Sequence, residues 1–316
     1  MNWKNALRPS ILMMVPAAIL LTGISSKAGD TTEAGARVRM TVTANVENGK
    51  RAPQIEKQDV FVQAGKNRLQ VAEWTPAREE HAGLELFVLI DDASRSTLGS
   101  HLDDLRSFIQ SQPATTAVGV GYARNATVEI LQNLTNDHDL ASKALRLPLG
   151  SAGAFGSPYL SVTDLMNRWP ATENRREVIL LTDGIDRAGR ARNALMNPDV
   201  DAAAAVAQRT GTLVHTIYFP GVGHWHRNWW DANNGQNGIA KLAELTGGES
   251  YFLGLHDPVS IRPYLDDLKK VLDNQYLVTF FAKPAKKAGL QYLSFGTEVA
   301  GVDFNAANAV WVPASR

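Results

Sequence analysis

The sequence contains no cysteine in its 316 residues. This absence excludes a disulfide framework, a zinc–thiolate site and a cysteine nucleophile. Lys plus Arg and Asp plus Glu both number 32, so the formal net charge is +0 and there is no basic field to attract nucleic acid or an anionic membrane. Walker-type, G-x-S-x-G, H-E-x-x-H and dinucleotide motifs are absent from any usable context. Binding or catalysis must therefore depend on locally arranged residues.

Only one long apolar run occurs, from Ile11 to Ile24, and it lies between Lys4 and Arg8 on one side and small polar residues on the other. This layout is typical of a secretory signal, so we predict a signal peptide over residues 1–28 and a secreted or periplasmic protein. The run is too short to span a bilayer comfortably. An uncleaved N-terminal membrane anchor is the alternative interpretation.

Short strands are expected on both sides of a central region. Residues 36–46 alternate strictly between apolar and polar side chains, which is typical of a half-buried antiparallel strand. Further strands are expected over 59–63, 68–74, 276–284, 290–299 and 308–313. We expect residues 29–80 and 275–316 to pair in one small antiparallel β domain, with another domain inserted between them.

The inserted region, 84–274, alternates strands with helices. Strands such as 84–90 and 177–183 are almost continuously apolar, which indicates burial on both faces of a sheet, and the helices at 100–109 and 260–274 are amphipathic. The pattern predicts an α/β domain with a doubly wound, mostly parallel sheet.

Carboxylate and hydroxyl side chains follow two of these strands. The segment "DDASRS" places Asp92, Ser94 and Ser96 after the first strand, and "TDG" places Asp183 after a later one. The carboxyl ends of parallel strands meet at one edge of the sheet, where ligands bind. Hard oxygen ligands without His or Cys suit Mg²⁺, with Mn²⁺ or Ca²⁺ as substitutes.

This combination resembles the von Willebrand factor A (VWFA) domain and its metal-ion-dependent adhesion site (MIDAS), from Leu84 to about Asn274. The resemblance is carried by "DASRS", by "TDG" and by "KLAELTGGESYF", and the flanking strands with "DNQYLVTF" are similar to bacterial VWFA-related secreted proteins of the Acidobacterial type. It implies a protein-binding module, not an enzyme, whose Mg²⁺ ion captures an Asp or Glu of a partner protein.

The resemblance also implies a ligand set. The family's intermediate loop supplies a threonine, for which Ser157 is the candidate here and Thr163, inside the next helix, the weaker one. The implied metal ligands are Asp92, Ser94, Ser96, Ser157 and Asp183.

Two residues depart from the family pattern. Arg95 lies between the two serines, where its guanidinium would compete with a cation if it turned inward. Asp91 precedes the motif and is expected to be a supporting neighbour. Two alternatives stay open: ion pairing replaces the metal, or the serines are local helix caps.

A second candidate feature is the segment 224–238, "HWHRNWWDANNGQNG", which is expected to be a long loop at the same edge of the sheet. Its aromatic and imidazole side chains suggest a partner-binding surface, although tryptophans in a long loop also pack to give the loop its own core. The candidate partner-binding residues are His224, Trp225, His226, Trp229 and Trp230.

Three functions compete. The first is a Mg²⁺-dependent protein-binding module, and the second is a metal-independent structural envelope protein with a degenerate site. The third is a Mg²⁺-dependent phosphatase-like hydrolase with Asp91 or Asp92 as nucleophile. That chemistry needs an aspartate two residues later, where Ala93 and Ser94 stand.

Overall fold

The structure is a computed structural model that describes residues 35–46, 53–188, 196–221, 229–252, 254, 258–283 and 287–314, with only the backbone at 229–230. The expected signal peptide, residues 1–28, lies outside the described residues. Among those residues, no helix combines the length and the apolar composition needed to cross a bilayer.

Six strands form the main sheet, in the order β10-β9-β8-β5-β6-β7. They are β5 (Leu84–Asp91), β6 (Thr116–Arg124), β7 (Thr127–Thr135), β8 (Arg175–Thr182), β9 (Thr212–Tyr218) and β10 (Ser250–Tyr251). All neighbours are parallel except β6 and β7, which form a hairpin whose turn residues Asn125 and Ala126 both have positive φ. The predicted doubly wound, mostly parallel sheet is confirmed.

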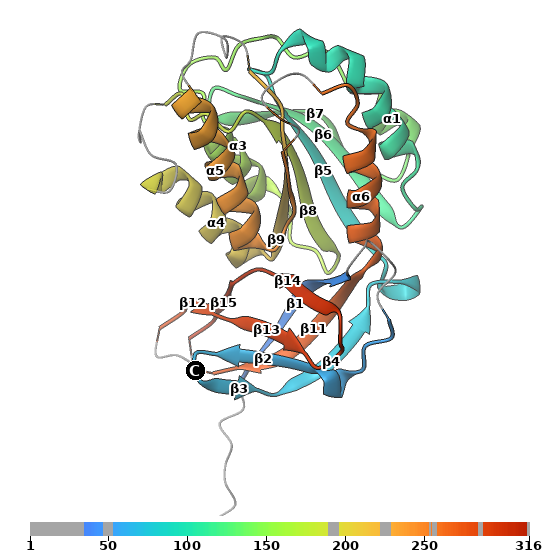
Figure 1. Ribbon diagram of the computed structural model, residues 1–316, viewed down its shortest axis with the longest axis vertical. Helices are drawn as coiled ribbons and strands as arrows, with labels where there is room; N and C mark the ends of the chain where they lie inside the picture. The colour runs from blue at the N-terminus through green and yellow to red at the C-terminus, as the bar shows by residue number, and fades with distance from the viewer. Residues whose placement is uncertain are drawn as a thin grey trace, which may run out of the picture. The chain divides into compact units, whose positions relative to one another are not determined.

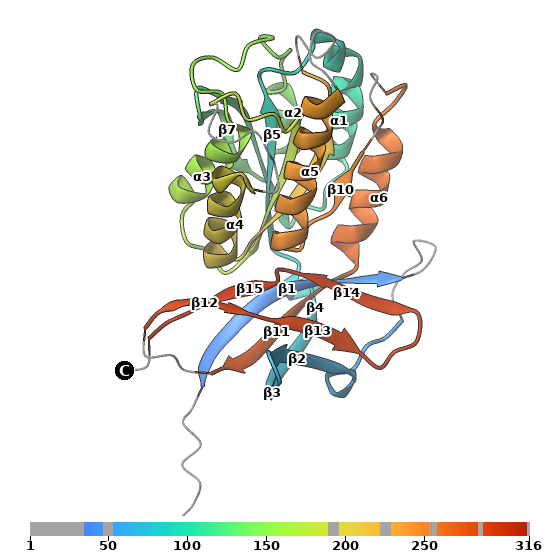
Figure 2. The ribbon, with the colours of Figure 1, turned by 60° about the vertical axis from the view of Figure 1, so that its left-hand side comes forward.

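Helices cover both faces of this sheet because successive side chains of β5 point to opposite sides (Figure 1). Leu86 and Ile90 pack in one hydrophobic core, and Phe87 and Leu89 pack in the other. The first core is covered by α1 (Leu102–Gln110), α2 (His138–Lys143) and α6 (Arg262–Asp273). The second is covered by α3 (Pro158–Arg168), α4 (Pro198–Thr210) and α5 (Trp229–Thr246), which form one layer in Figure 2.

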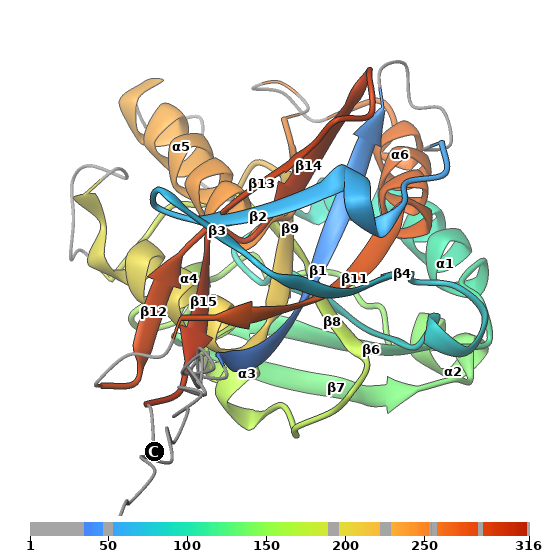
Figure 3. The same cartoon turned by 90° about the horizontal axis from the view of Figure 1, so that it is seen from below.

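The remaining strands are antiparallel. A four-stranded sheet in the order β14-β1-β11-β4 joins segments from both ends of the described chain (Figure 3). Its strands are β1 (Ala36–Val46), β4 (Val71–Pro76), β11 (Gln275–Ala282) and β14 (Val302–Ala306). Smaller sheets pair β2 (Val60–Ala64) with β3 (Asn67–Leu69) and β13 (Ser294–Thr297), and β12 (Gly289–Tyr292) with β15 (Ala309–Val312). Strands β1 and β11 pair in a register that aligns Ala36 with Ala282 and Thr43 with Gln275. In the sequence, these two strands therefore lie on opposite sides of the α/β insertion.

Several element boundaries differ from the expectation. Short 3-10 helices occur at η2 (Lys57–Asp59), η3 (Glu79–His81) and η4 (Ser96–His101), and η4 makes the entry to α1 longer than predicted. The expected strand 68–74 is divided between β3 and β4, and 290–299 between β12 and β13. The expectation of a loop over 224–238 was wrong from Trp229 onward, because α5 begins there, ten residues before the predicted helix start.

Candidate functional site

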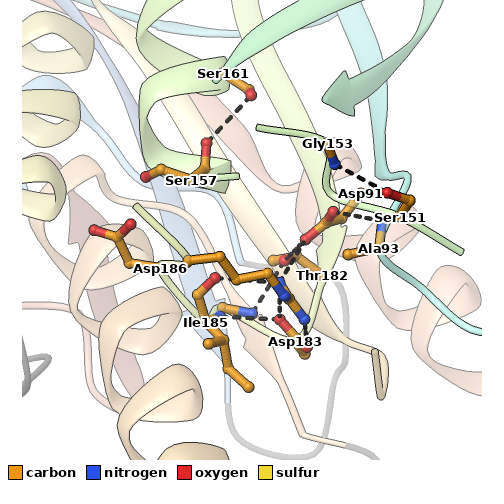
Figure 4. Close-up of polar contacts among 12 residues, drawn as sticks. Asp91, Ala93, Ser151, Gly153, Ser157, Ser161, Thr182, Asp183, Ile185 and Asp186 are labelled. Atoms are coloured by element: carbon orange, nitrogen blue, oxygen red, sulfur yellow. Dashed lines mark hydrogen bonds and ion pairs between the residues drawn. The ribbon is translucent and has the colours of Figure 1, made fainter. Parts of the chain in front are cut away.

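The ends of β5 and β8 bring two carboxylates together at the point where the strand order reverses. β5 is followed by β6 on one side, whereas β8 is followed by β9 on the other. Such a switch point is where open α/β sheets bind ligands. Figure 4 shows Asp91 beside Thr182 and Asp183 at this place. Both carboxylates are buried, with 3% and 1% of the residue surface exposed.

Asp91 is held by short local contacts. Its Oδ1 accepts a hydrogen bond from the Ala93 amide at 2.9 Å, and its Oδ2 accepts one from Thr182 Oγ1 at 2.7 Å. Burial and, next, the nearby charge of Asp183 raise the pKa of Asp91 to about 6, although Arg187 and these hydrogen bonds oppose the rise. The carboxylate is therefore destabilised by its surroundings and depends on nearby donors.

Arg187 supplies the missing positive charge. Its Nη1 lies 3.2 Å from Asp183 Oδ1 and its Nη2 lies 2.5 Å from Asp183 Oδ2, while Nη1 is 4.0 Å from Asp91 Oδ2. Burial opposes the charged form, but the carboxylates of Asp183 and Asp91 raise the pKa of Arg187. The loop after β8 turns at Gly184, with a φ of 69°, and the Arg187 amide donates to the Gly156 carbonyl.

Asp92 points to a different partner. Its two oxygens accept hydrogen bonds from Arg146 Nη1 at 2.7 Å and Nη2 at 3.0 Å, and the Leu149 amide donates to its Oδ1 at 3.1 Å. The Arg146 guanidinium also lies over the Tyr122 ring, 3.8 Å from its centre. The carboxylate that meets Asp183 is thus that of Asp91, where the sequence analysis expected Asp92, because adjacent residues at a strand end project in opposite directions.

The three predicted serine ligands have different environments. Ser94 is buried, and its Oγ has no hydrogen-bond partner among the described residues. Ser96 is exposed at the start of η4. Ser157 caps α3, where its side chain accepts from the Leu160 amide, and it lines one small recess with Asp91 and Arg187. The cap interpretation therefore accounts for Ser157.

Arg95 does not occupy the position between Asp91 and Asp183. Its Nε donates to the Gly221 carbonyl at 3.3 Å, and its amide donates to the Pro220 carbonyl. The guanidiniums that bind the strand-end carboxylates belong instead to Arg146 and Arg187, which the sequence analysis missed. The signal for Arg187 is its position four residues after Asp183 in "DGIDR", whereas Arg146 is 54 residues from Asp92 and had no sequence signal.

As placed, these residues do not fit a divalent cation. Arg187 takes both oxygens of Asp183 and Arg146 takes both oxygens of Asp92. A cation here would meet guanidinium groups instead of free oxygens. Among the side chains that the structure describes, no group of three or more His, Asp or Glu residues is placed to hold a metal ion.

The proposed aromatic surface is largely beyond what the structure covers. Residues 222–228, with His224, Trp225 and His226, lie outside the described residues. Trp229 and Trp230 begin α5, and only their backbone is described. Their role in partner binding stays a prediction.

No protein-family model and no curated protein matches the sequence. Among solved structures, BatB from Bacteroides thetaiotaomicron is 16% identical, covering 60% of this chain and 98% of that chain, with a TM-score of 0.42. The manganese-loaded TRAP protein of Plasmodium vivax is 13% identical, covering 71% and 92%, with a TM-score of 0.38. Proximal thread matrix protein 1 from the mussel byssus, solved with a zinc-occupied MIDAS motif, is 12% identical, covering 62% and 46%, with a TM-score of 0.38.

These similarities concern the fold and assign no ligand to this chain. The described sheet order and its two helical layers are those of a doubly wound α/β domain, as expected from the sequence. The Acidobacterial-type subgroup stays a prediction.

Proposed function

We propose that this chain is a non-enzymatic protein-interaction module of the VWFA type whose strand-end carboxylates are neutralised by arginines instead of by a cation. The observation that carries the proposal is the contact of Arg187 with both oxygens of Asp183 and its approach to Asp91. The pairing of Asp92 with Arg146 supports it. Buried carboxylates need such compensation, and arginine supplies it with planar, paired donors.

The proposed binding face is formed by the loops around these strand ends. Arg124, at the end of β6, is partly exposed and lies with Asp91 and Arg187 around a gap too small to hold a water molecule. Leu149 and Phe155, in the segment between α2 and α3, are 55% and 74% exposed. A cation beside apolar side chains favours a partner segment that presents an Asp or Glu next to apolar residues.

We further propose that the module acts outside the cytoplasm, as a secreted or periplasmic protein whose signal peptide is residues 1–28. This rests on the charged, apolar and polar segments of the N-terminal sequence. The segment with His224, Trp225, His226, Trp229 and Trp230 would add aromatic contacts at the same edge of the sheet.

The test compares partner capture by the immobilised chain from an extracytoplasmic fraction with and without EDTA. We expect the same proteins to be retained in both conditions. Arg124→Gln should release them, whereas Arg209→Gln, an exposed residue in the last turn of α4, should not. Retention that depends on a divalent cation, or that is unchanged in Arg124→Gln, contradicts the proposal.

A Mg²⁺-dependent site is the second candidate, and the unpartnered buried Oγ of Ser94 favours it. Its ligands would be Asp92, Ser94, Ser96, Ser157 and Asp183. This requires that Arg146 and Arg187 release the carboxylates of Asp92 and Asp183. Calorimetric titration with Mg²⁺ or Mn²⁺ separates the two candidates. Saturable binding to the wild-type chain that Asp183→Ala removes would support this one, and no binding would support the arginine-held site.

A further inference from the structure

A second cavity lies at the opposite edge of the main sheet, where the parallel strands begin. It has a volume of about 200 Å³ and is bounded by the segment between β4 and β5, by the α1–β6 connection and by the C-terminal turn of α6. Leu84, Thr116 and Arg175, the first residues of β5, β6 and β8, line it. Nothing in the strand-end site uses these residues.

Arg175 gives this cavity its main charge. The residue is 7% exposed, and its guanidinium donates to the carbonyls of Ala82, at 3.1 Å, and Leu272, at 3.3 Å, on two walls of the cavity. Its Nη1 also donates to the side-chain oxygen of Gln275, and its Nε is buried without a hydrogen-bond partner among the described residues. The closest ion pair is with Glu177, at 3.8 Å, and that carboxylate also accepts a hydrogen bond from His215. Burial lowers the pKa of Arg175, although an arginine remains charged.

Two more cations line the cavity and also use carbonyl groups. Arg78 Nη2 donates to the Asp273 carbonyl at 3.0 Å, and Lys269 Nζ donates to the Ser111 carbonyl at 3.3 Å. A carbonyl oxygen satisfies a donor without neutralising its charge. The carboxylates of Asp273 and Glu79 belong to exposed residues on the cavity lining, where water weakens their effect.

The rest of the lining is largely apolar. Its apolar members are Ala77, Ala82, Leu84, Pro113 and Leu272. The volume equals roughly seven waters at about 30 Å³ each and is below the roughly 300–1,000 Å³ of pockets for larger ligands. The cavity thus combines cationic donors, apolar walls and a small size.

We propose that this cavity binds a small carboxylate with a short apolar chain. The carboxylate lies beside the Arg175 guanidinium and pairs with Lys269 and Arg78, which line the same cavity. The apolar chain packs against Leu84 and Leu272. A carboxylate there would balance positive charge that the carbonyl partners of these three cations leave unneutralised.

The test is calorimetric titration of the full chain with sodium butyrate, with inorganic phosphate and 1-butanol as comparison ligands. We expect saturable binding of butyrate, and weak or no binding of phosphate, which lacks the apolar chain, or of butanol, which lacks the charge. Arg175→Gln should weaken butyrate binding by about tenfold or more. Arg262→Gln, on the same helix α6 as Lys269 but outside the cavity, is the matched control and should leave binding within about twofold of wild type.

Lys269→Met covers the case in which Arg175→Gln fails to fold, because Lys269 is partly exposed. It should weaken butyrate binding severalfold while circular dichroism stays unchanged. The proposal is overturned if the wild-type chain does not bind butyrate saturably, or if folded variants at both positions bind it as the wild type does. Equal binding of phosphate or butanol would overturn the assignment to a small carboxylate.

Discussion

Arg187 binds both carboxylate oxygens of Asp183, at 3.2 Å and 2.5 Å, although only three residues separate the two in the sequence. Its guanidinium is largely buried, with 15% of the side chain exposed, and it also approaches Asp91. Two buried carboxylates therefore share one cation that the chain itself supplies.

Removal of Arg187 should destabilise the protein strongly. Arg187→Ala leaves Asp91 and Asp183 buried without a cation, and we expect it to lower the free energy of unfolding by about 3–5 kcal/mol in urea denaturation. The control is Arg262→Ala, which removes a 60% exposed arginine side chain while its partner Asp104 keeps the hydrogen bond from Ser260, and it should cost less than about 1 kcal/mol. A loss from Arg187→Ala as small as that of the control would show that water or another group neutralises the carboxylates.

The second arginine pair should be energetically coupled. We expect Asp92→Asn and Arg146→Met to be less than additive, with a coupling of about 1–3 kcal/mol, because they contact one another through two hydrogen bonds. A double-mutant cycle of urea denaturation measures it. A cycle that pairs Asp92→Asn with Arg187→Met should show weaker coupling, because Arg187 contacts Asp183 and Asp91 instead; equal coupling in both cycles would mean that the two arginines share one network.

The Asp183–Arg187 pair should leave no room for a side chain at Gly221. A Cβ on Gly221 would collide with the Asp183 carboxylate and lie 2.7 Å from Arg187 Nη2. Gly221→Ala should therefore lower the free energy of unfolding by about 1–3 kcal/mol. Gly289→Ala is the matched control, since a Cβ there meets nothing within 4 Å, and it should change stability by less than about 0.5 kcal/mol. If both variants are equally stable, the pair is looser than its distances indicate.

The contribution of Asp91 to stability should decrease as the pH rises through the range in which this residue titrates. Its pKa is about 6 in the folded protein and 3.8 as the ordinary value, so the folded state holds the proton longer. The stabilising contribution is complete below pH 3.8 and is lost as the pH rises to about 6. Compared with wild type, Asp91→Asn should gain up to about 3 kcal/mol in relative stability between these limits and then level off.

The measurement is urea denaturation of both proteins from pH 4 to pH 8. Glu173→Gln is the control, because the Glu173 side chain is 97% exposed and its substitution should leave the pH dependence unchanged. A constant difference between Asp91→Asn and wild type across this range would contradict the raised pKa.

Elements with strong periodicity were predicted well from the sequence. The alternation over 36–46 predicted the bounds of β1, although Thr41 and Thr43, expected on its polar side, are buried. The continuous apolar runs predicted β5 and β8. The predicted start of α5 was wrong. This helix begins at Trp229, within a segment rich in Asn and Gly, a composition that is typical of loops. The tertiary packing of α5 outweighed the preference of its Asn and Gly residues for a loop.

The sequence by itself determined that strands ending in Asp91-Asp92 and in Asp183 lie in one doubly wound sheet, because hydrophobic period and the order of elements are local properties of the chain. Only the tertiary structure decided which carboxylates meet and what neutralises them. Asp91 approaches Asp183 while Asp92 turns to Arg146, and Arg187 folds back onto the pair. Two adjacent aspartates have the same chemistry in the sequence, and their different partners depend on side-chain directions and on contacts between distant segments.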